Sequence, residues 1–303
     1  MSQTRHAVSV SLGSSKRDKR VTVKFKDTPV IIERIGTDGD AEAARRLFRE
    51  LDGKVDAFGT GGVDLYIIVD GKKYPLRAAH KLVADVRQTP VVDGQGLKHT
   101  LERRVFELAA PQLREKPHFR RVFMPLALDR IGLAEAIDEV ADEIIFGDFM
   151  VGLGLPLPIR GLKAYKRVLK TMLPIVGFFP LSMLFYGSDG VEFEPKYEAY
   201  WAQSDLIAGD FMFMKKYMPP KYMEGKFVIS NTTTDENVSF LKEHGVRTLL
   251  TTTPRYDGRS FGTNMMEAAL TAYAGKGRPL TREELNALID ELDLRPTVLH
   301  LNP

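Results

Sequence analysis

A cluster of polar side chains follows a short predicted strand at residues 90–92. It contains Asp93, Lys98 and His99, which could supply an acid, a base and an orienting group for proton transfer. The alternative is a glycine-loosened turn in which the lysine and histidine are solvated. The chain shows no Ser-His-Asp triad or nucleophile elbow. Proton transfer by Asp93 and Lys98 is therefore the most economical chemistry that these residues allow.

A predicted βαβ unit carries a second set of candidates, with strands at 121–126 and 143–146 and a helix at 131–140. Its first turn contains Asp129, Arg130 and Gly132, and Asp148 follows its second strand. A dinucleotide-binding fold places its ribose-binding acid there, about 20 residues after the first turn. The turn lacks GxGxxG, and Asp129 would repel a diphosphate unless Arg130 offsets its charge. The alternative for Asp148 is an N-cap or a turn.

Two threonine-rich loops each follow a predicted strand and are candidates for cofactor binding. They contain Thr232, Thr233 and Thr234, and Thr252 and Thr253. Hydroxyl and free N–H groups at a helix N-terminus suit a phosphate or carboxylate, while capping and strand-end hydrogen bonds explain the same residues equally well. Thr233 with Glu236, and Thr281 with Glu284, have the spacing of a capping box.

A further set of polar residues and glycines is predicted to bind the substrate or another anion. It comprises Arg259, Ser260, Thr263 and Asn264, around the start of a helix at 263–274, and Gly61 and Gly62. Arginines in a polar loop before a helix suit an anionic ligand. The two glycines could bring the backbone close to a ligand, although a turn explains them as well.

Two α/β domains are needed to position these residues. The pattern predicts an N-terminal α/β domain over 1–115 and a Rossmann-like domain over 118–303, joined by a charged, proline-bounded stretch. The second domain should contain a parallel sheet, because its strands alternate with helices. Ligands bind beyond the carboxyl ends of such strands, so we expect a ligand cleft between the two domains.

An apolar insertion at about 150–190 interrupts the second domain. Pro174, Gly177 and Pro180 break its most apolar part, which makes a single spanning helix improbable. Four cations just before it share one helical face: Arg160, Lys163, Arg167 and Lys170. This pattern is typical of an interfacial helix. Residues 160–187 are therefore candidates for a peripheral membrane contact, a homo-oligomer contact or a lid, against an ordinary surface helix before a buried hairpin.

The amino-acid composition limits the partners, metal sites and cell compartments that we expect for this protein. The 303 residues carry 43 basic and 40 acidic side chains, a net charge of +3, so no nucleic-acid partner is expected. With no cysteine and no HxxxH pair, we expect no metal site. The polar N-terminus resembles no secretory signal, and we expect a cytoplasmic protein with a small-molecule ligand.

The sequence resembles bacterial proteins of about 300 residues commonly labelled quinate 5-dehydrogenase. The similar strings are Val8–Ser15, Ile35–Asp40, Thr89–Arg103, Asp205–Asp210 and Arg259–Ala268. Shikimate and quinate dehydrogenases share the layout of a catalytic α/β domain before a nucleotide-binding domain, and use a Lys–Asp pair in the first. No position here matches their lysine motif, so Lys98 and Asp93 are assigned by role. The start of the chain also resembles actin-like ATPases and sugar kinases, with Ser11 where their acid lies.

The leading hypothesis is an enzyme, an NAD(P)-dependent oxidoreductase acting on a hydroxylated carboxylic acid that resembles quinate or shikimate. The resemblance implies NAD or NADP as its cofactor. Two alternatives stay open. One is a transferase or phosphate-ligand enzyme, including a peripheral-membrane form, and the other is a non-catalytic ligand-binding protein.

Overall fold

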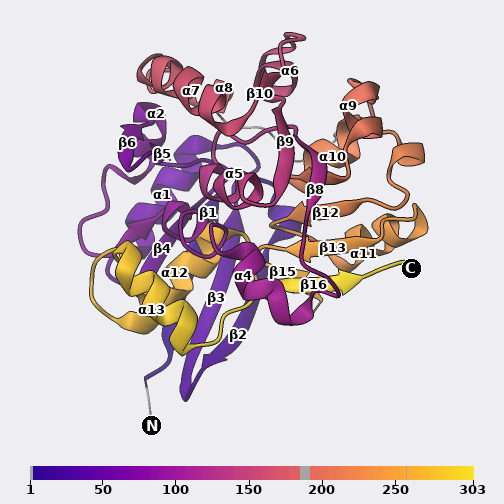
Figure 1. The fold of residues 1–303 in the computed structure, drawn as a ribbon. Coiled ribbons are helices and arrows are strands. Elements are labelled where there is room, and N and C mark those ends of the chain that lie inside the picture. The colour runs from indigo at the N-terminus through magenta and orange to yellow at the C-terminus, as the bar shows by residue number, and fades with distance from the viewer. Residues whose placement is uncertain (1–2, 185–191, 257) are drawn as a thin grey trace. The chain divides into compact units, whose positions relative to one another are not determined.

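The computed structural model describes residues 3–184, 192–256 and 258–303 (Figure 1). The chain forms two compact units, each assembled from separated segments. The first contains Met1–Thr100, Lys170–Asp189 and Gly262–Asp293, and the second contains Leu101–Leu169, Gly190–Phe261 and Leu294–Pro303. Each unit has its own sheet and helices, so the α/β class with two α/β domains is confirmed.

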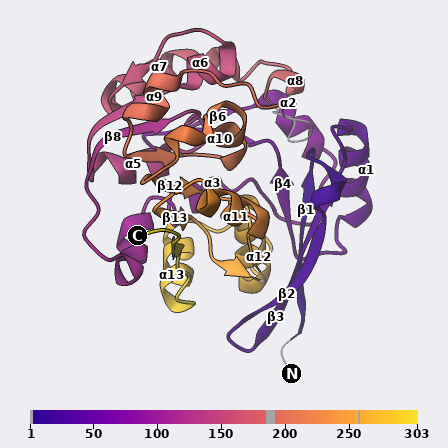
Figure 2. The same ribbon diagram turned by 90° about the vertical axis from the view of Figure 1, so that its right-hand side faces the viewer.

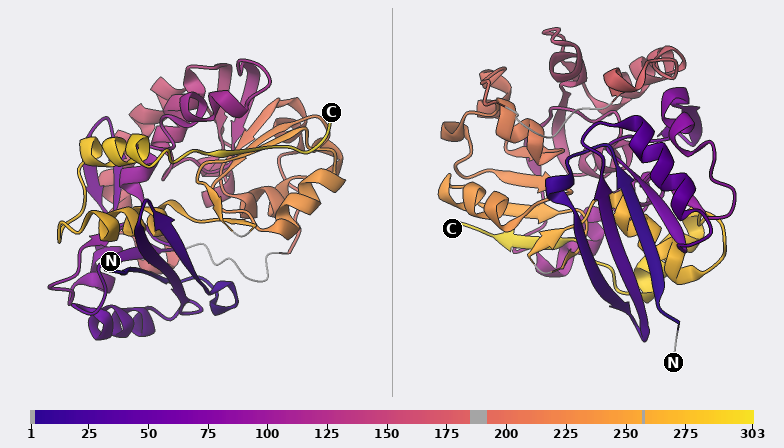
Figure 3. Two further views of the ribbon diagram at one scale, coloured as in Figure 1. Left: turned by 90° about the horizontal axis from the view of Figure 1, so that it is seen from below. Right: turned by 180° about the vertical axis from the view of Figure 1, so that it is seen from behind.

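The first unit is built on a five-stranded sheet of order β2-β3-β1-β4-β7. The strands are β1 (Arg5–Ser11), β2 (Lys19–Phe25), β3 (Thr28–Gly36), β4 (Ala57–Gly61) and β7 (Val91–Val92). All pairs are parallel except β2 with β3. The long strands β1, β2 and β3 are the indigo arrows in the right panel of Figure 3. Ser11 is in register with Gly36 and Gly61, so the loops after β1, β3 and β4 start at one edge.

Helices cover both faces of this sheet, with α1 (Ala41–Leu51) and α12 (Thr263–Ala274) on opposite sides (Figure 2). Nine residues of α12 are buried, because small and apolar side chains occupy nearly its whole circumference. The unit also contains a hairpin and several short helices. They are β5 (Tyr66–Val69), β6 (Lys72–Pro75), α2 (Arg77–His80), α3 (Gln95–Lys98), α8 (Leu181–Leu184) and α13 (Arg282–Glu291).

The second unit has a seven-stranded sheet of order β10-β9-β8-β11-β12-β13-β16. Its strands are β8 (Phe119–Met124), β9 (Ala141–Phe146), β10 (Ile159–Arg160), β11 (Leu206–Ala208), β12 (Phe227–Ser230), β13 (Thr248–Thr251) and β16 (Thr297–His300). The five central strands are parallel, and the two edge strands are antiparallel. The predicted βαβ unit and parallel sheet are therefore confirmed.

Helices and one aromatic cluster complete the second unit. Trp201 is fully buried and packs edge-on against Phe123 of β8, with ring centroids 4.7 Å apart. The helices are α4 (Val105–Ala109), α5 (Ile131–Asp138), α6 (Asp148–Leu153), α9 (Glu198–Gln203), α10 (Phe211–Tyr217) and α11 (Asp235–Glu243). The short strands β14 (Arg255–Tyr256) and β15 (Arg259–Ser260) pair with each other after β13.

The observed units differ from the predicted division into consecutive segments. The predicted helices α12 and α13 exist, but α12 packs on β1, β3 and β4 of the first sheet, and the chain then returns to the second sheet as β16. Helical periodicity gives no information about which of two sheets buries an apolar helix. The structure also differs from the actin-like resemblance in the pairing of its first strand. That resemblance implies pairing of β1 with the next strand, but β1 pairs with β3 and β4 on its two sides.

The apolar insertion contains α7 (Leu162–Val176), with Pro174 inside it, followed by α8. Tyr165 is fully buried and stacks on Phe146 of β9, with ring centroids 3.9 Å apart. Among the described residues, no helix is long and apolar enough to cross a membrane. Residues 185–191 of the predicted insertion lie outside the described part of the chain.

Candidate active site

Lys98 is the last residue of α3 and is nearly buried, and it makes an ion pair that we did not predict. Its Nζ donates a hydrogen bond to Oδ1 of Asp64 at 2.7 Å, and the two side chains are 5% and 13% exposed. Asp64 follows β4 and α3 follows β7, so the pair lies at the carboxyl edge of the first sheet. A buried ion pair holds both groups in a fixed geometry, as proton transfer requires.

Asp93 is engaged by main-chain groups. Its Oδ2 accepts hydrogen bonds from the N–H groups of Leu65 (2.8 Å) and Tyr66 (3.1 Å), and its Oδ1 accepts one from Gln95 (3.0 Å). These bonds tie the loop after β7 to the hairpin that begins at β5. Asp93 therefore orders the main chain around Lys98, and its predicted part in proton transfer stays a prediction. His99 ends α3, and its side chain is also buried.

Glu267 is a buried acid of α12 that the sequence analysis missed. Its Oε2 accepts a hydrogen bond from the N–H of Leu97 at 3.1 Å. A Cβ on Gly96 would lie 2.6 Å from its Oε1, so the Glu267 side chain would have to shift for any larger residue at this position. Burial raises the pKa of Glu267 to about 8, with a further contribution from Asp93. One signal could have found it, because it is the single charge among the apolar residues 265–270.

The pKa of Glu267 predicts a pH dependence of stability. Folding raises this pKa from 4.5 to about 8, so the folded state binds the proton more tightly than the unfolded state. The free energy of unfolding should therefore fall as pH rises from about 4.5 to 8, by at most about 1.4 kcal/mol per pH unit. Glu267→Gln keeps an acceptor and removes the titration. Melting curves should show the variant gaining stability over the wild type as pH rises; a constant difference would contradict the burial argument.

Four residues predicted to bind the substrate or another anion make packing contacts in the first unit. The Nδ2 of Asn264 donates to Ser9 Oγ at 2.7 Å. A Cβ on Gly94 would lie 2.7 Å from both the Thr263 Oγ1 and the Asn264 N, so the start of α12 is packed tightly against this loop. A Cβ on Gly61 would lie 2.5 Å from that of Ser11, and Gly62 has a positive φ of 81°. These contacts explain the two glycines by close strand packing and a turn.

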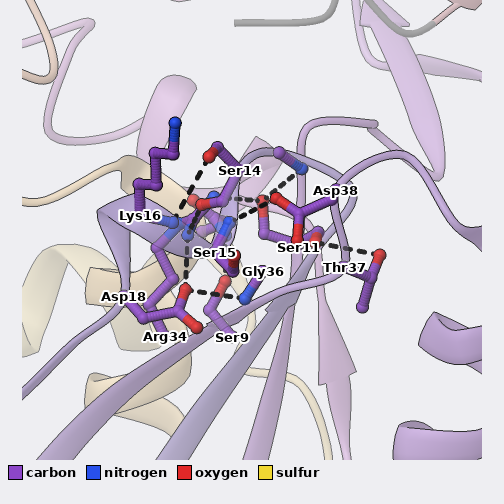
Figure 4. Close-up of polar contacts among 12 residues, drawn as sticks. Ser9, Ser11, Ser14, Ser15, Lys16, Asp18, Arg34, Gly36, Thr37 and Asp38 are labelled. Atoms are coloured by element: carbon purple, nitrogen blue, oxygen red, sulfur yellow. Dashed lines mark hydrogen bonds and ion pairs between the residues drawn. The ribbon is translucent and has the colours of Figure 1, made fainter. Parts of the chain in front are cut away.

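The loop after β1 is held by its own polar contacts, as Figure 4 shows. Arg34 donates to Ser11 Oγ (2.9 Å), to Ser14 O (2.8 Å) and to Asp18 Oδ1 (2.7 Å). Asp38 accepts from the N–H of Ser15 at 2.8 Å, which lowers the pKa of its carboxyl. Ser11, predicted at the place of a phosphate-site acid, thus helps to order this loop.

The strand order of the second sheet reverses between β8 and β11, where α/β sheets bind ligands. Asp148 lies at this edge, and its Oδ1 accepts hydrogen bonds from the N–H groups of Ala127 (3.1 Å) and Leu128 (2.8 Å). Burial raises the pKa of Asp148 to about 6, against the effect of these bonds. The Asp148 carboxylate therefore orders the first turn of the βαβ unit, and its ribose contact stays a prediction.

Arg130 and Thr252, both predicted to bind a cofactor, converge on a carboxylate of the chain itself. Glu102 Oε1 accepts a hydrogen bond from Arg130 Nη1 at 2.6 Å and from Thr252 Oγ1 at 2.9 Å. Glu102 is 0% exposed, and its Oε2 is buried without a hydrogen-bond partner in the described structure. Asp129 lies 3.9 Å from Arg130, so Glu102 is the closer of these two acids. These two predicted residues thus bind an anion, but an internal one.

Two helices, α5 and α11, begin at this edge, and their first turns differ in charge. Thr234 caps α11 through the N–H of Asn237, so the capping box starts one residue later than predicted, and Asp235 and Glu236 place negative charge in the first turn. In α5 the first turn contains Gly132 and no acid, and its N-cap side chain makes no capping bond. The acids in the first turn of α11 therefore disfavour a diphosphate there, and the first turn of α5 carries no such charge.

Three of the remaining predicted residues of this edge, Thr233, Thr253 and Ser260, are buried. Thr233 N–H donates to Ser260 Oγ at 2.8 Å, and Thr253 Oγ1 donates to Phe261 O at 2.6 Å. Thr232 lies in the same loop, and Arg259 precedes Ser260 on β15. Ser230 Oγ and Asn231 Oδ1 are buried without a hydrogen-bond partner in the described structure. The hydroxyl groups of a nucleoside are suitable partners for these two atoms.

The described residues contain no group of three or more His, Asp or Glu side chains that could hold a metal ion. Every residue of the predicted proton-transfer set belongs to the first unit, and every residue of the predicted cofactor set belongs to the second. The predicted anion-binding residues divide between the two, since Arg259 and Ser260 belong to the second unit and Thr263 and Asn264 to the first.

Two sheets with these sites define an α/β protein. The chain belongs to the family described as a domain of unknown function, DUF8754, whose model matches residues 96–301. A second family model, also described as a domain of unknown function (DUF8753), matches residues 6–93. A comparison with curated proteins found no match.

Solved structures similar to the chain include two malic enzymes. One is the NAD-dependent malic enzyme of Thermotoga maritima, with 11% identity and a TM-score of 0.41 over 93% of this chain and 75% of that one. The other is the malic enzyme of Entamoeba histolytica, with 11% identity and a TM-score of 0.39 over 95% of this chain and 67% of that one. Similarity at this level assigns no activity to the chain.

Proposed function

We propose that this protein is an NAD(P)-dependent oxidoreductase that acts on a hydroxylated carboxylic acid of the quinate or shikimate type. The observation that carries the proposal is the Lys98–Asp64 pair, 2.7 Å apart and nearly buried at the carboxyl edge of a parallel sheet. Lysine held by a carboxylate is a proton donor and acceptor that needs no metal ion or thiol. It is the pair that the dehydrogenase resemblance implies, with Asp64 in place of Asp93.

Proton transfer is the step assigned to the first unit. In the direction of alcohol oxidation, the amine form of Lys98 accepts the proton of the substrate hydroxyl as the carbon loses its hydride. In the reverse direction, the ammonium of Lys98 returns that proton to the forming alkoxide. Asp64 orients the Nζ of Lys98 by its 2.7 Å hydrogen bond, and Asp93 and Glu267 hold both ends of the segment that carries Lys98.

Cofactor binding is assigned to the carboxyl edge of the second sheet. A nicotinamide dinucleotide, when bound, supplies the hydride acceptor and donor. The N–H groups at the start of α5 suit its diphosphate, because the first turn has no acid and no side-chain cap. The buried Ser230 Oγ and Asn231 Oδ1 would satisfy their hydrogen bonds with its hydroxyl groups.

A binding titration tests this proposal. The full chain is titrated with NADH and NADPH, read by nicotinamide fluorescence and by thermal shift, and then assayed with quinate, shikimate and other hydroxy acids. We expect saturable binding of one dinucleotide and a higher melting temperature in its presence. Stabilisation by ATP or a UDP-sugar without any by either dinucleotide would reject the oxidoreductase and favour a phosphate-ligand enzyme.

A further inference from the structure

Large exposed apolar side chains are concentrated in one part of the chain. All those that the described residues expose lie between residues 153 and 193. They include Leu153, Leu155 and Leu157, in the proline-containing segment after α6, and Ile175, Phe178 and Met183 near the end of α7 and in α8. Single exposed apolar residues are ordinary on a surface, but a concentration of this kind marks an interaction site.

Cations occupy the same segment and continue the exposed face of α7. Lys163, Arg167 and Lys170 are exposed at spacings of four and three residues, so they share one side of the helix. One turn further along this side, the exposed residues become apolar, at Pro174 and Ile175. The exposed face therefore changes from basic to apolar along its length.

The opposite face of α7 is anchored, so the exposed residues are presented by ordered structure. Tyr165, Leu169 and Leu173 are buried. At the end of the helix, the N–H of Arg77 donates to Gly177 O at 3.0 Å, and the Arg77 guanidinium lies 4.1 Å from the ring centroid of Phe178. Phe178 is nevertheless 66% exposed, because the contact with Arg77 covers only part of it.

We propose that the exposed face of α7, with Phe178 just after it, docks on an anionic lipid bilayer. A bilayer matches both chemistries, because anionic headgroups attract the cations and the acyl boundary accepts the apolar side chains next to them. The helix is too short and too polar to span the membrane, so the contact is interfacial. Lys163 and Arg167 are both exposed on this face and are the cations that we test.

Vesicle co-sedimentation of the full chain tests the proposal. One set of vesicles contains phosphatidylcholine alone, and the other adds phosphatidylserine. We expect the protein to pellet with the anionic vesicles at low salt, to be released by high salt, and to stay in solution with the neutral ones. Equal behaviour with both kinds of vesicle would overturn the electrostatic part of the proposal, and no sedimentation with either would overturn the whole.

Two variants and one matched control identify the residues. The charge reversal Lys163→Glu with Arg167→Glu should lower partitioning at least tenfold, at about fivefold per basic residue. Ile175→Ser with Phe178→Ser should lower it without changing the salt dependence. The control, Lys242→Glu with Arg282→Glu, reverses two exposed cations elsewhere and should bind like the wild type. If the control loses as much vesicle binding as the variants, the contact is not specific to this surface and the proposal fails. If the variants change only the oligomeric state, this face binds a second copy of the chain and the proposal also fails.

Discussion

Replacing Lys98 by methionine is expected to abolish turnover of the proposed hydroxy-acid substrate. General acid–base catalysis by a positioned side chain contributes about 10²- to 10⁴-fold, and methionine cannot carry the proton. The loss should appear in kcat measured at saturating dinucleotide, because Lys98 belongs to the first unit and the cofactor residues to the second. Cofactor binding by this variant should stay at the wild-type level.

A stability control separates this loss from unfolding. Lys98→Met leaves the Asp64 carboxylate without its cation, and removing one partner of a buried pair costs about 3–5 kcal/mol, less here because Asp64 is 13% exposed. The double variant Lys98→Met with Asp64→Leu removes both charges and should melt close to the wild type. It should still be inactive. Recovery of activity in the double variant would exclude Lys98 as the proton-transfer group.

Replacing Glu102 by leucine is expected to cause a large loss of stability in the second unit. Arg130 is 6% exposed and lies 2.6 Å from the Glu102 carboxylate, so the variant buries a guanidinium without that counter-charge. The expected cost is about 3–5 kcal/mol, measured as a shift in the urea midpoint of that unit. The cavity left by a shorter side chain is avoided, because leucine nearly conserves the volume.

Two further variants show whether the charge is responsible. Thr252→Val removes only the hydroxyl that donates to Glu102 and should cost about 1 kcal/mol. Glu102→Leu with Arg130→Met removes both charges and should recover most of the lost stability. If Glu102→Leu unfolds at the same urea concentration as the wild type, the pair contributes nothing to the fold, and Arg130 is left to act on a ligand.

Local sequence patterns predicted the positions of several helices and strands. They did not predict which distant residues contact one another. The alternation of strands and helices over 121–146 was enough for the βαβ unit, because the period of each element is set by its own residues. The capping box at Thr281 and Glu284 was confirmed for the same reason. The box predicted at Thr233 was wrong by one residue, since three consecutive threonines satisfy the same spacing rule.

The candidate site is formed by pairs of residues that are distant in the sequence. Rules on the spacing of residues do not predict such pairs. Lys98 bonds to Asp64, and Leu97 bonds to Glu267, which is 170 residues away in the sequence. Asp93 was chosen because it is near Lys98 in sequence, but main-chain N–H groups had the better geometry for its carboxylate. Glu102 was overlooked because the sequence pattern predicts a helix over 97–108, and an acid in a surface helix is ordinarily solvated. A short α3 ends at Lys98 instead, and Glu102 is buried.

The return of α12 to the first sheet has a consequence for biosynthesis. β4 ends at Gly61, and α12 begins at Thr263, so about 200 residues must be translated before this face of β1, β3 and β4 is covered. Until then, the ribosome carries a chain whose first sheet exposes an apolar surface to solvent or to a chaperone. The first unit can therefore be completed only after most of the second unit has been synthesised.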